Sequence, residues 1–415
     1  MQTTRTHIQT RDTEMRARAA RVIPGGMYGH QNAGTLPEGF PQFLERGRGC
    51  HIWDVDDNEY IDFMCSYGPI ILGHADPIVD AAAAEQQSNA DCQDGPSSRI
   101  VELAELLVET IPHADWAVFQ KNGTDATTLC VSIARAATGR RKVLVARGAY
   151  HGSAPWCTPR PAGTTPEDRA HLLHYTYNDL ASVEAAAAEA GSDLAAIVVS
   201  PFRHDAGLDQ ELVDPAFARG LRELCDRAGA ALILDDVRCG FRLSLQGSWE
   251  PVGVRPDLSA FSKAIANGYP LAAVVGRDSF RDAVRQVFAT GSFWFAAVPM
   301  AAALATITTL RDTDALVRLA AAGEALRHGL ATQAESYGVR VRQTGPVQMP
   351  FLSFVGDTEY ERARLFTGEA IKRGVYLHPR HNWFLSAAHS QEDINDALEV
   401  TDVAFAKVRE AFGDD

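Results

Sequence analysis

Two nearby stretches of sequence decide the fold: residues 231–240 read ALILDDVRCG, and residues 258–276 read LSAFSKAIANGYPLAAVVG. The apolar runs 231–234 and 258–261 have the length and composition of buried strands. The first run ends in Asp235, and the second is followed by Ser262 and Lys263. Because ligands of open α/β sheets bind at the carboxyl ends of the strands, we expect Asp235 and Lys263 to face a ligand.

Lys263 has neighbours that favour reactivity. Alanine, isoleucine, glycine and proline surround it in the sequence, so its amine should be poorly solvated. Desolvation lowers the pKa of an ammonium group and leaves more of it as the nucleophilic amine. Taken singly, Lys263 could still be an exposed loop residue, and Asp235 could cap the following turn.

Outward from these stretches, apolar runs of strand length alternate with segments of helical period. This alternation is typical of a mostly parallel sheet covered by helices on both faces, so we predict an α/β fold. The expected strands are Trp116–Gln120, Lys142–Arg147, Ala195–Ser200, Ala231–Leu234, Leu258–Phe261 and Leu271–Val275, and the expected helices are Arg99–Thr110, Ala126–Thr138, Ser182–Ala190 and Asp214–Arg227.

The two ends of the chain differ from this middle part. An amphipathic helix around Asp12–Val22 precedes a meander of short strands between residues 43 and 64, and the C-terminal part again mixes strands with helices. We predict a second, smaller α+β domain built from both ends. The expected boundaries are 1–65 for the N-terminal segment, 66–311 for the large domain and 312–415 for the C-terminal part.

Composition excludes several classes of protein. Of 415 residues, 46% are hydrophobic and 22% are charged, as in soluble globular proteins. No apolar run has the ~18 residues of a membrane helix, and a net charge of −14 leaves no basic patch for nucleic acid. Seven cysteines without a C-x-x-C spacing favour reduced thiols, and the N-terminal residues lack the apolar region of a signal peptide. We therefore expect a cytoplasmic location, and no metal site is predicted.

Two further motifs lie in loops that follow strands. QKNGTDA (120–126) joins a strand end to a helix start, where the amides of Gly123 and Thr124 would bind an anion such as phosphate; the alternative is an ordinary helix cap. GAYHG (148–152) offers the Tyr150 ring for stacking on a planar ligand, although a plain turn is equally compatible. A flat ring, a phosphate, an anionic partner and a carbonyl for a lysine amine together describe pyridoxal phosphate (PLP).

The motifs NGTDA, ARAATGR, GAYHG, LILDDVRCGFR and FSKAIANGYPLAAVVG resemble those of the class-III aminotransferases, which are PLP enzymes of fold type I. The likeness is greatest to the glutamate-1-semialdehyde aminomutase branch and extends from about Arg18 to His389. It implies a mostly parallel sheet of the seven-stranded type in a large PLP-binding domain. It also implies a homodimer with active sites at the interface.

The resemblance assigns roles to particular residues of this chain. Lys263 would form the Schiff base with PLP and act as general acid and base, and Asp235 would pair with the pyridine nitrogen. In this family a serine or threonine of the partner subunit reaches the phosphate, and Ser292 (or Thr290) is the matching residue. The expected catalytic residues are Lys263, Asp235 and Tyr150, and the expected cofactor-binding residues are Asn122, Gly123, Thr124, Tyr150, His151, Asp235, Val237, Lys263 and Ser292.

One departure from the aminomutases bears on the substrate. Asn32 stands where they have an arginine that binds the substrate carboxylate. A neutral amide cannot make that bidentate ion pair, so an α-amino acid is less favoured as the main substrate. Aromatic and polar residues suit a sugar, and the acidic surplus suits a cationic amine. The expected substrate-binding residues are Tyr28, Asn32, Tyr67, Trp294 and Arg380.

We therefore expect an aminotransferase that moves an amino group onto a carbonyl at the exocyclic 6′-carbon of an amino-sugar in aminoglycoside antibiotic biosynthesis. The mechanism would be ping-pong, with L-glutamate or a second aminoglycoside as the amino donor. The alternative is a PLP-dependent isomerase, either an epimerase or an aminomutase, on the same amino-sugar scaffold. A cofactor-binding regulator would need a fused DNA-binding domain, and the chain offers no basic N-terminal segment for one.

Overall fold

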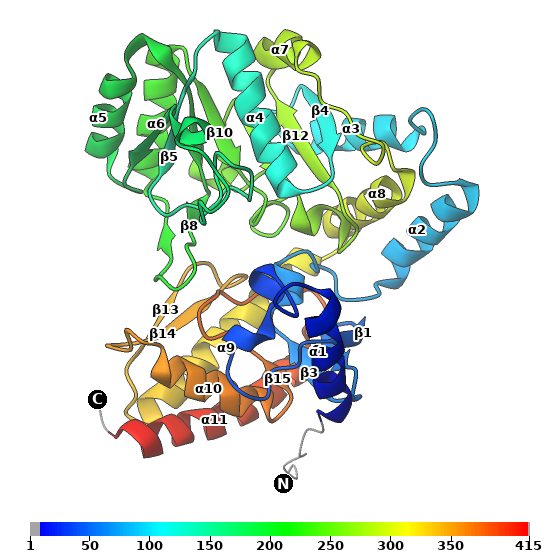
Figure 1. Cartoon of the computed structure of the whole chain (residues 1–415), viewed down its shortest axis with the longest axis vertical. Coiled ribbons are helices and arrows are strands. Elements are labelled where there is room, and N and C mark those ends of the chain that lie inside the picture. The colour runs from blue at the N-terminus through cyan, green and yellow to red at the C-terminus, as the bar shows by residue number, and fades with distance from the viewer. Residues whose placement is uncertain (1–8, 414–415) are drawn as a thin grey trace. The chain divides into compact units, whose positions relative to one another are not determined.

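The computed structural model describes residues 9–413, which divide into two compact units (Figure 1). We call Pro77–Asp205 together with Gln210–Asp314 the large unit. The small unit contains the chain up to Asp76, the segment Ala206–Asp209 and the chain from Ala315 onward. The domain boundaries expected from the sequence stay a prediction.

Among the described residues, a seven-stranded sheet forms the centre of the large unit, with the order β4-β12-β11-β10-β7-β5-β6. Neighbouring strands pair in parallel except β12, which runs antiparallel to β11 and β4. The predicted α/β fold with a mostly parallel sheet is therefore confirmed. The strands are β4 (Trp116–Gln120), β5 (Lys142–Ala146), β6 (Leu172–Tyr175), β7 (Leu194–Val199), β10 (Ala231–Asp235), β11 (Leu258–Phe261) and β12 (Ala272–Gly276).

Helices cover both faces of this sheet, and the side chains of each central strand alternate between them (Figure 1). On β10, Leu232 and Leu234 pack with α5 and α6, whereas Ala231 and Ile233 pack with α4. Burial on both faces explains why these strands are unbroken apolar runs. The helices are α2 (Pro77–Asn89), α3 (Arg99–Thr110), α4 (Gly123–Thr138), α5 (Leu180–Ala190), α6 (Pro215–Ala228), α7 (Arg281–Gln286) and α8 (Ala297–Asp312), and a short hairpin pairs β8 (Phe202–Arg203) with β9 (Glu211–Leu212).

The small unit contains a four-stranded sheet with the order β1-β2-β3-β15. The first three strands form the predicted antiparallel meander, and β15 from the C-terminal part adds in parallel to β3. The elements are α1 (Thr10–Val22), β1 (Leu44–Arg48), β2 (His51–Asp54), β3 (Glu59–Asp62), α9 (Ala315–Ser336), β13 (Val341–Thr344), β14 (Phe351–Phe354), α10 (Glu361–Ile371), β15 (Val375–Tyr376) and α11 (Gln391–Phe412). Within residues 9–413, no helix combines the length and apolar character needed to cross a bilayer.

Two glycines of α9 provide a matched test of packing in the small unit. A Cβ added to Gly323 would lie 2.2 Å from the carbonyl oxygen of Val347, whereas one added to Gly329 would lie 2.4 Å from the movable Cδ1 of Leu398. We expect Gly323→Ala to lower the free energy of unfolding by about 2–3 kcal/mol, because overpacking against backbone outweighs alanine's helix propensity. Gly329→Ala should cost less than about 1 kcal/mol, because the leucine can move. Urea unfolding measures both changes, and equal losses would contradict this account of the packing.

Candidate active site

The carboxyl end of β10 carries a buried carboxylate that is held by a histidine. Asp235 ends β10, and its Oδ2 lies 2.7 Å from Nδ1 of His151, in the loop after β5. Both residues are buried, at 5% and 3% exposure. The backbone N–H of Val237 donates to Asp235 Oδ1 at 3.2 Å. Each carboxylate oxygen has two lone pairs, so Asp235 keeps acceptor capacity for a ligand.

His151 is positioned by residues to which the sequence analysis gave no role. The hydroxyl of Thr127 donates to the His151 carbonyl oxygen at 2.7 Å, and the Trp156 ring stacks on the imidazole at 6.5 Å between centroids. The second imidazole nitrogen, Nε2, is buried and has no hydrogen-bond partner among the described residues. A buried polar atom without a partner is uncommon and points to a missing ligand or water.

Lys263 follows β11, which pairs in parallel with β10 so that Ala260 lies opposite Asp235. The two functional groups therefore share the carboxyl edge of the sheet, as predicted. Burial, reinforced by the Arg238 guanidinium, lowers the pKa of the Lys263 amine to about 7, and Asp235 opposes the shift. Because its pKa lies near 7, a large part of the Lys263 amine is unprotonated at neutral pH. The backbone of Lys263 has a φ of +47°, a left-handed conformation that costs roughly 1–2 kcal/mol in a non-glycine residue.

The turn before α4 forms a tight cradle in which a side chain would not fit. A Cβ on Gly123 would lie 2.6 Å from Cγ1 of Val237, and a Cβ on Gly152 would lie 2.6 Å from Oγ1 of Thr124. The N–H of Ser153 donates to the same hydroxyl at 3.1 Å. The first amides of a helix have no partner within it, so this cradle offers Gly123 and Thr124 amides to an anion.

Asn122 and Tyr150 flank this cradle in different ways. The Asn122 side chain caps α4, accepting from the Asp125 N–H at 3.0 Å and donating to Asp125 Oδ2 at 2.7 Å. Tyr150 is 44% exposed, and partial burial raises the pKa of its hydroxyl. Its ring therefore has an open face, and contacts of Asn122 and Tyr150 with a cofactor stay predictions.

Asp236, the next residue after Asp235, has a structural role. It is completely buried, where the N–H of Ser248 donates to Oδ2 at 2.9 Å and the Ser248 hydroxyl donates to Oδ1. Burial raises the pKa of this carboxyl to about 7, and the two bonds from Ser248 oppose the rise. The adjacent carboxylates thus have different surroundings: Asp235 bonds to the histidine, and Asp236 bonds to a serine.

The segment that carries Ser292 lies on the surface of the large unit. Ser292 is exposed, and Nε1 of Trp294 donates to Oε1 of Gln120 at the end of β4. Phe288, Phe293 and Phe295 are 93%, 62% and 40% exposed. Three aromatic side chains of this short segment therefore face solvent in the described structure.

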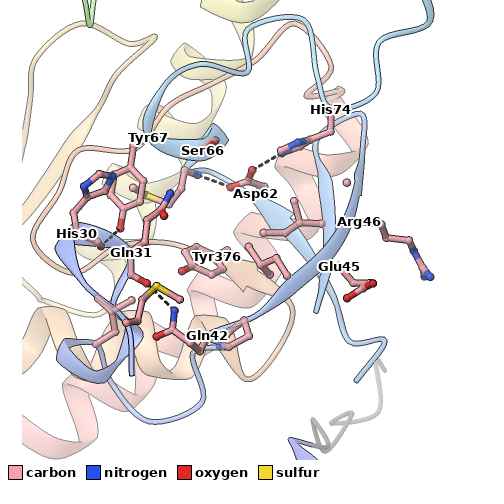
Figure 2. A pocket seen from close by; sticks show the side chains of 17 residues that line it. His30, Gln31, Gln42, Glu45, Arg46, Asp62, Ser66, Tyr67, His74 and Tyr376 are labelled. Atoms are coloured by element: carbon pink, nitrogen blue, oxygen red, sulfur yellow. Dashed lines mark hydrogen bonds and ion pairs between the residues drawn. The ribbon is translucent and has the colours of Figure 1, made fainter. Parts of the chain in front are cut away.

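Four of the five residues predicted to bind substrate lie in the small unit. Tyr28 is 76% exposed, and the Asn32 amide is used within its own loop, donating to the Met27 carbonyl at 3.0 Å and accepting from the Gly34 N–H at 2.9 Å. The Tyr67 hydroxyl donates to the His30 carbonyl at 2.9 Å (Figure 2). The exposed Arg380 stacks on the ring of Tyr360 at 4.6 Å. Their contacts with a substrate stay predictions.

Comparison with known proteins gives one consistent family. The sequence profile of the family described as aminotransferase class-III matches residues 36–398. The chain is 49% identical over 403 residues to an aminopentol aminotransferase of Sphingopyxis macrogoltabida, covering 97% of this chain and 96% of that protein. It is 34% identical over 432 residues to a glutamate-1-semialdehyde 2,1-aminomutase of Bordetella avium, covering 96% and 100%. The solved PLP internal aldimine form of the FumI protein of Sphingopyxis sp. MTA144 superposes with a TM-score of 0.96 at 49% identity, covering 97% of each chain.

The raised pKa of Asp236 predicts a pH-dependent stability. Between about pH 4 and pH 7, the folded chain holds a proton on Asp236 that an unfolded carboxyl with a pKa of 3.8 has released. Its contribution to stability therefore falls as the pH rises through this range. In Asp236→Asn the amide can still bond to Ser248 and does not titrate, so we expect this variant to gain stability relative to the wild type as the pH rises from 4 to 7.

Unfolding midpoints of the cofactor-free protein at several pH values measure this effect. Asp396→Asn, on the exposed face of α11, is the control and should follow the wild type. A variant that loses stability relative to the wild type as the pH rises would contradict the assignment of a buried, protonated Asp236.

Proposed function

Because the chain belongs to the class-III aminotransferases and uses PLP, we propose that it transfers an amino group between a hydroxylated aliphatic amine without an α-carboxylate and a 2-oxo acid. The observation that carries this proposal is the use of the Asn32 amide inside its own loop. The family, the enzyme class and the cofactor predicted from the sequence are confirmed by the comparisons. The substrate, the roles of individual residues and the assembly are proposals.

The candidate site fits PLP in its charge and shape. When bound, PLP supplies an aldehyde for a lysine amine and a protonated pyridine ring that withdraws electrons from the reacting carbon. Lys263 would hold the aldehyde carbon, and Asp235 would hold the pyridine nitrogen. The amides of Gly123 and Thr124 would bind the phosphate in a cradle too tight for a Cβ on Gly123 or Gly152.

Lys263 is proposed to move the proton of the reaction. Its Nζ has a pKa of about 7, so at neutral pH it can both accept and release a proton. Burial keeps water from competing for this proton, and the Arg238 guanidinium resists protonation of the amine. The same amine is thus suited to capture the aldehyde first and to act as base afterwards.

His151 is proposed to orient Asp235. An ionised carboxylate only accepts, so Nδ1 of His151 donates across the 2.7 Å contact. Thr127 and Trp156 fix the loop and the ring. His151 would therefore act as a positioning residue through Asp235, and Asp235 would provide the charge that the pyridine nitrogen needs.

The proposed substrate class follows from two side chains of the small unit, Asn32 and Arg380. A bidentate arginine is the residue suited to a carboxylate, and the matching position holds Asn32, whose amide already bonds to backbone at both ends. The relative with 49% identity is described as acting on an aminopentol, a name that denotes an amine with five hydroxyl groups. The amino-sugar predicted from the sequence belongs to the same chemical class of hydroxylated amine. Arg380, exposed over the Tyr360 ring, would meet the side-chain carboxylate of a dicarboxylic 2-oxo acid such as 2-oxoglutarate, a group that L-alanine lacks.

The exposed segment around Ser292 supports the predicted homodimer. Three phenylalanines with 40–93% exposure lie within eight residues of one another, and burial of each against a second copy would contribute roughly 1.5–3 kcal/mol. Ser292 would then reach the phosphate bound by the partner. A dimer interface at this segment would bury the apolar rings that one chain alone exposes to solvent.

Lys263→Ala tests the proposed chemistry. We expect transamination to fall by at least about a hundredfold, because the variant lacks both the amine that captures the cofactor and the general base. The matched control is Lys142→Ala, since Lys142 lies at the amino end of β5, the opposite edge of the sheet. Steady-state rates with a saturating amine measure both variants. Full activity in Lys263→Ala, or equal loss in both, would contradict the proposed role.

A panel of amino donors tests the substrate class. With 2-oxoglutarate as acceptor, a linear amino-polyol should have a kcat/KM at least about tenfold above that of L-alanine, because an unpaired carboxylate loses a charged hydrogen bond. An aminoglycoside with a primary amine on its exocyclic carbon is the third donor. Its ranking above the linear polyol would favour the amino-sugar, and a ranking below would favour the open-chain amine. A preference for L-alanine over both would contradict the proposal.

A further inference from the structure

A group of side chains in the small unit has the composition of a metal site, and the proposed chemistry does not use it. His51 begins β2, Cys50 directly precedes it, and Asp393 lies in the first turn of α11. One ligand atom from each of these three residues lies within 4.8 Å of the other two. Glu59, on β3, is the fourth member, since its Oε1 lies 3.1 Å from Nδ1 of His51. All four residues belong to one compact unit.

The three ligand atoms converge on the carboxyl group of Asp393. Nε2 of His51 lies 2.9 Å from Oδ1 of Asp393, and the Cys50 thiol bonds to the same carboxyl group. With zinc–ligand bonds of about 2.0–2.3 Å, the ligand atoms of a tetrahedral site are about 3.3–3.5 Å apart. The imidazole and the carboxylate would therefore separate by roughly 0.4 Å to admit an ion. Side-chain rotation alone can provide a movement of this size.

Neighbouring groups orient both the carboxylate and the imidazole. The second oxygen of Asp393, Oδ2, accepts from the Ser390 N–H at 2.8 Å and from its hydroxyl at 2.6 Å, so Oδ1 is the oxygen left for His51. A metal-binding imidazole usually donates its other N–H to a carboxylate. Nδ1 of His51 is buried and makes no well-aligned hydrogen bond, although Glu59 lies 3.1 Å away. Rotation of the exposed Glu59 side chain would align this pair.

The donor set and the charges match Zn²⁺. Sulfur, imidazole nitrogen and carboxylate oxygen are its protein ligands, and the two negative charges of a Cys50 thiolate and Asp393 would balance the ion. Without a metal, burial raises the pKa of the Cys50 thiol, and the nearby Asp393 charge adds to the rise. The ion would therefore displace the thiol proton, and one proton would be released for each ion bound. The side chains of His51 and Glu59 are 30% and 40% exposed, which leaves a path from solvent.

We propose that Cys50, His51 and Asp393 bind one Zn²⁺ ion, with water as the fourth ligand and Glu59 supporting the imidazole. The ion would tie β2 to α11 and so join the N-terminal and C-terminal parts of the small unit. No local motif announces such a site, because His51 and Asp393 are 342 residues apart. The inference does not rest on the proposed function, since neither PLP nor a substrate takes part in it.

Zinc titration of the holoenzyme tests the proposal, after dialysis against EDTA and in competition with a chromophoric chelator. We expect one ion per chain. His51→Gln should weaken binding at least about a hundredfold because it removes a ligand, and Glu59→Gln should weaken it about tenfold because it removes the supporting carboxylate. The control is His328→Gln, exposed on α9, which should bind as the wild type does. No binding at millimolar Zn²⁺, or equal affinity in His51→Gln and the wild type, would overturn the inference.

Cobalt(II) in place of zinc reports on the ligands themselves. A tetrahedral Co²⁺ ion with a thiolate ligand has absorption bands at the red end of the visible spectrum, where PLP does not absorb. We expect these bands after one equivalent of Co²⁺ and expect Cys50→Ser to lose them. The control is Cys92→Ser, whose thiol is exposed on the large unit and which should keep them. Bands that persist in Cys50→Ser, or that disappear in Cys92→Ser, would contradict the assignment of this site.

Thermal unfolding provides a second readout in case Cys50→Ser fails to fold. An ion that binds only the folded chain raises its unfolding midpoint, so Zn²⁺ should raise that of the wild type. In Asp393→Asn the amide oxygen can still accept from the Ser390 N–H, but the charged ligand is lost. Zn²⁺ should therefore leave the midpoint of this variant unchanged. An equal rise in both proteins would place the ion elsewhere and overturn the proposal.

Discussion

The structure of the large unit depends on keeping one lysine amine out of water at the edge of the sheet. Burial and the Arg238 guanidinium disfavour the charged form of Lys263, and Asp235 is the opposing charge, so the pKa of the amine settles at about 7. A flexible side chain in solvent could not keep this balance, because water would restore the ordinary pKa. The parallel pairing of β10 and β11 and the left-handed backbone of Lys263 hold the two groups in this arrangement.

Of the residues around Lys263 and Asp235, some set the charge of the site and others set its shape. His151, fixed by Thr127 and Trp156, bonds to the Asp235 carboxylate, and the turn at Gly123 packs against Val237. The next residue, Asp236, has a structural role, since its carboxyl group is buried and bonded to Ser248. In the proposed account, the large unit performs the chemistry, and the residues that choose the amine belong mainly to the small unit.

The fold was largely predictable because two-sided burial makes β7, β10 and β12 unbroken apolar runs. The edge strand β6 was missed because three of its four side chains are partly or fully exposed, so the strand has no unbroken buried apolar run. Lys263 and Asp235 could be placed at one edge because both follow strands of a parallel sheet. The pairing of His151 with Asp235, 84 residues apart, depends on loop geometry that no local pattern encodes.

The most direct test of the central claim is to identify which lysine captures PLP and at what pH. The cofactor-free protein would be mixed with PLP between pH 5.5 and 9, reduced with borohydride after short intervals, and mapped by peptide mass spectrometry. The account predicts that the cofactor mass appears on Lys263, with a rate that rises with pH and levels off near pH 7. Label on another lysine, or a rate that still rises with pH between 8 and 9 as for an ordinary amine, would contradict it.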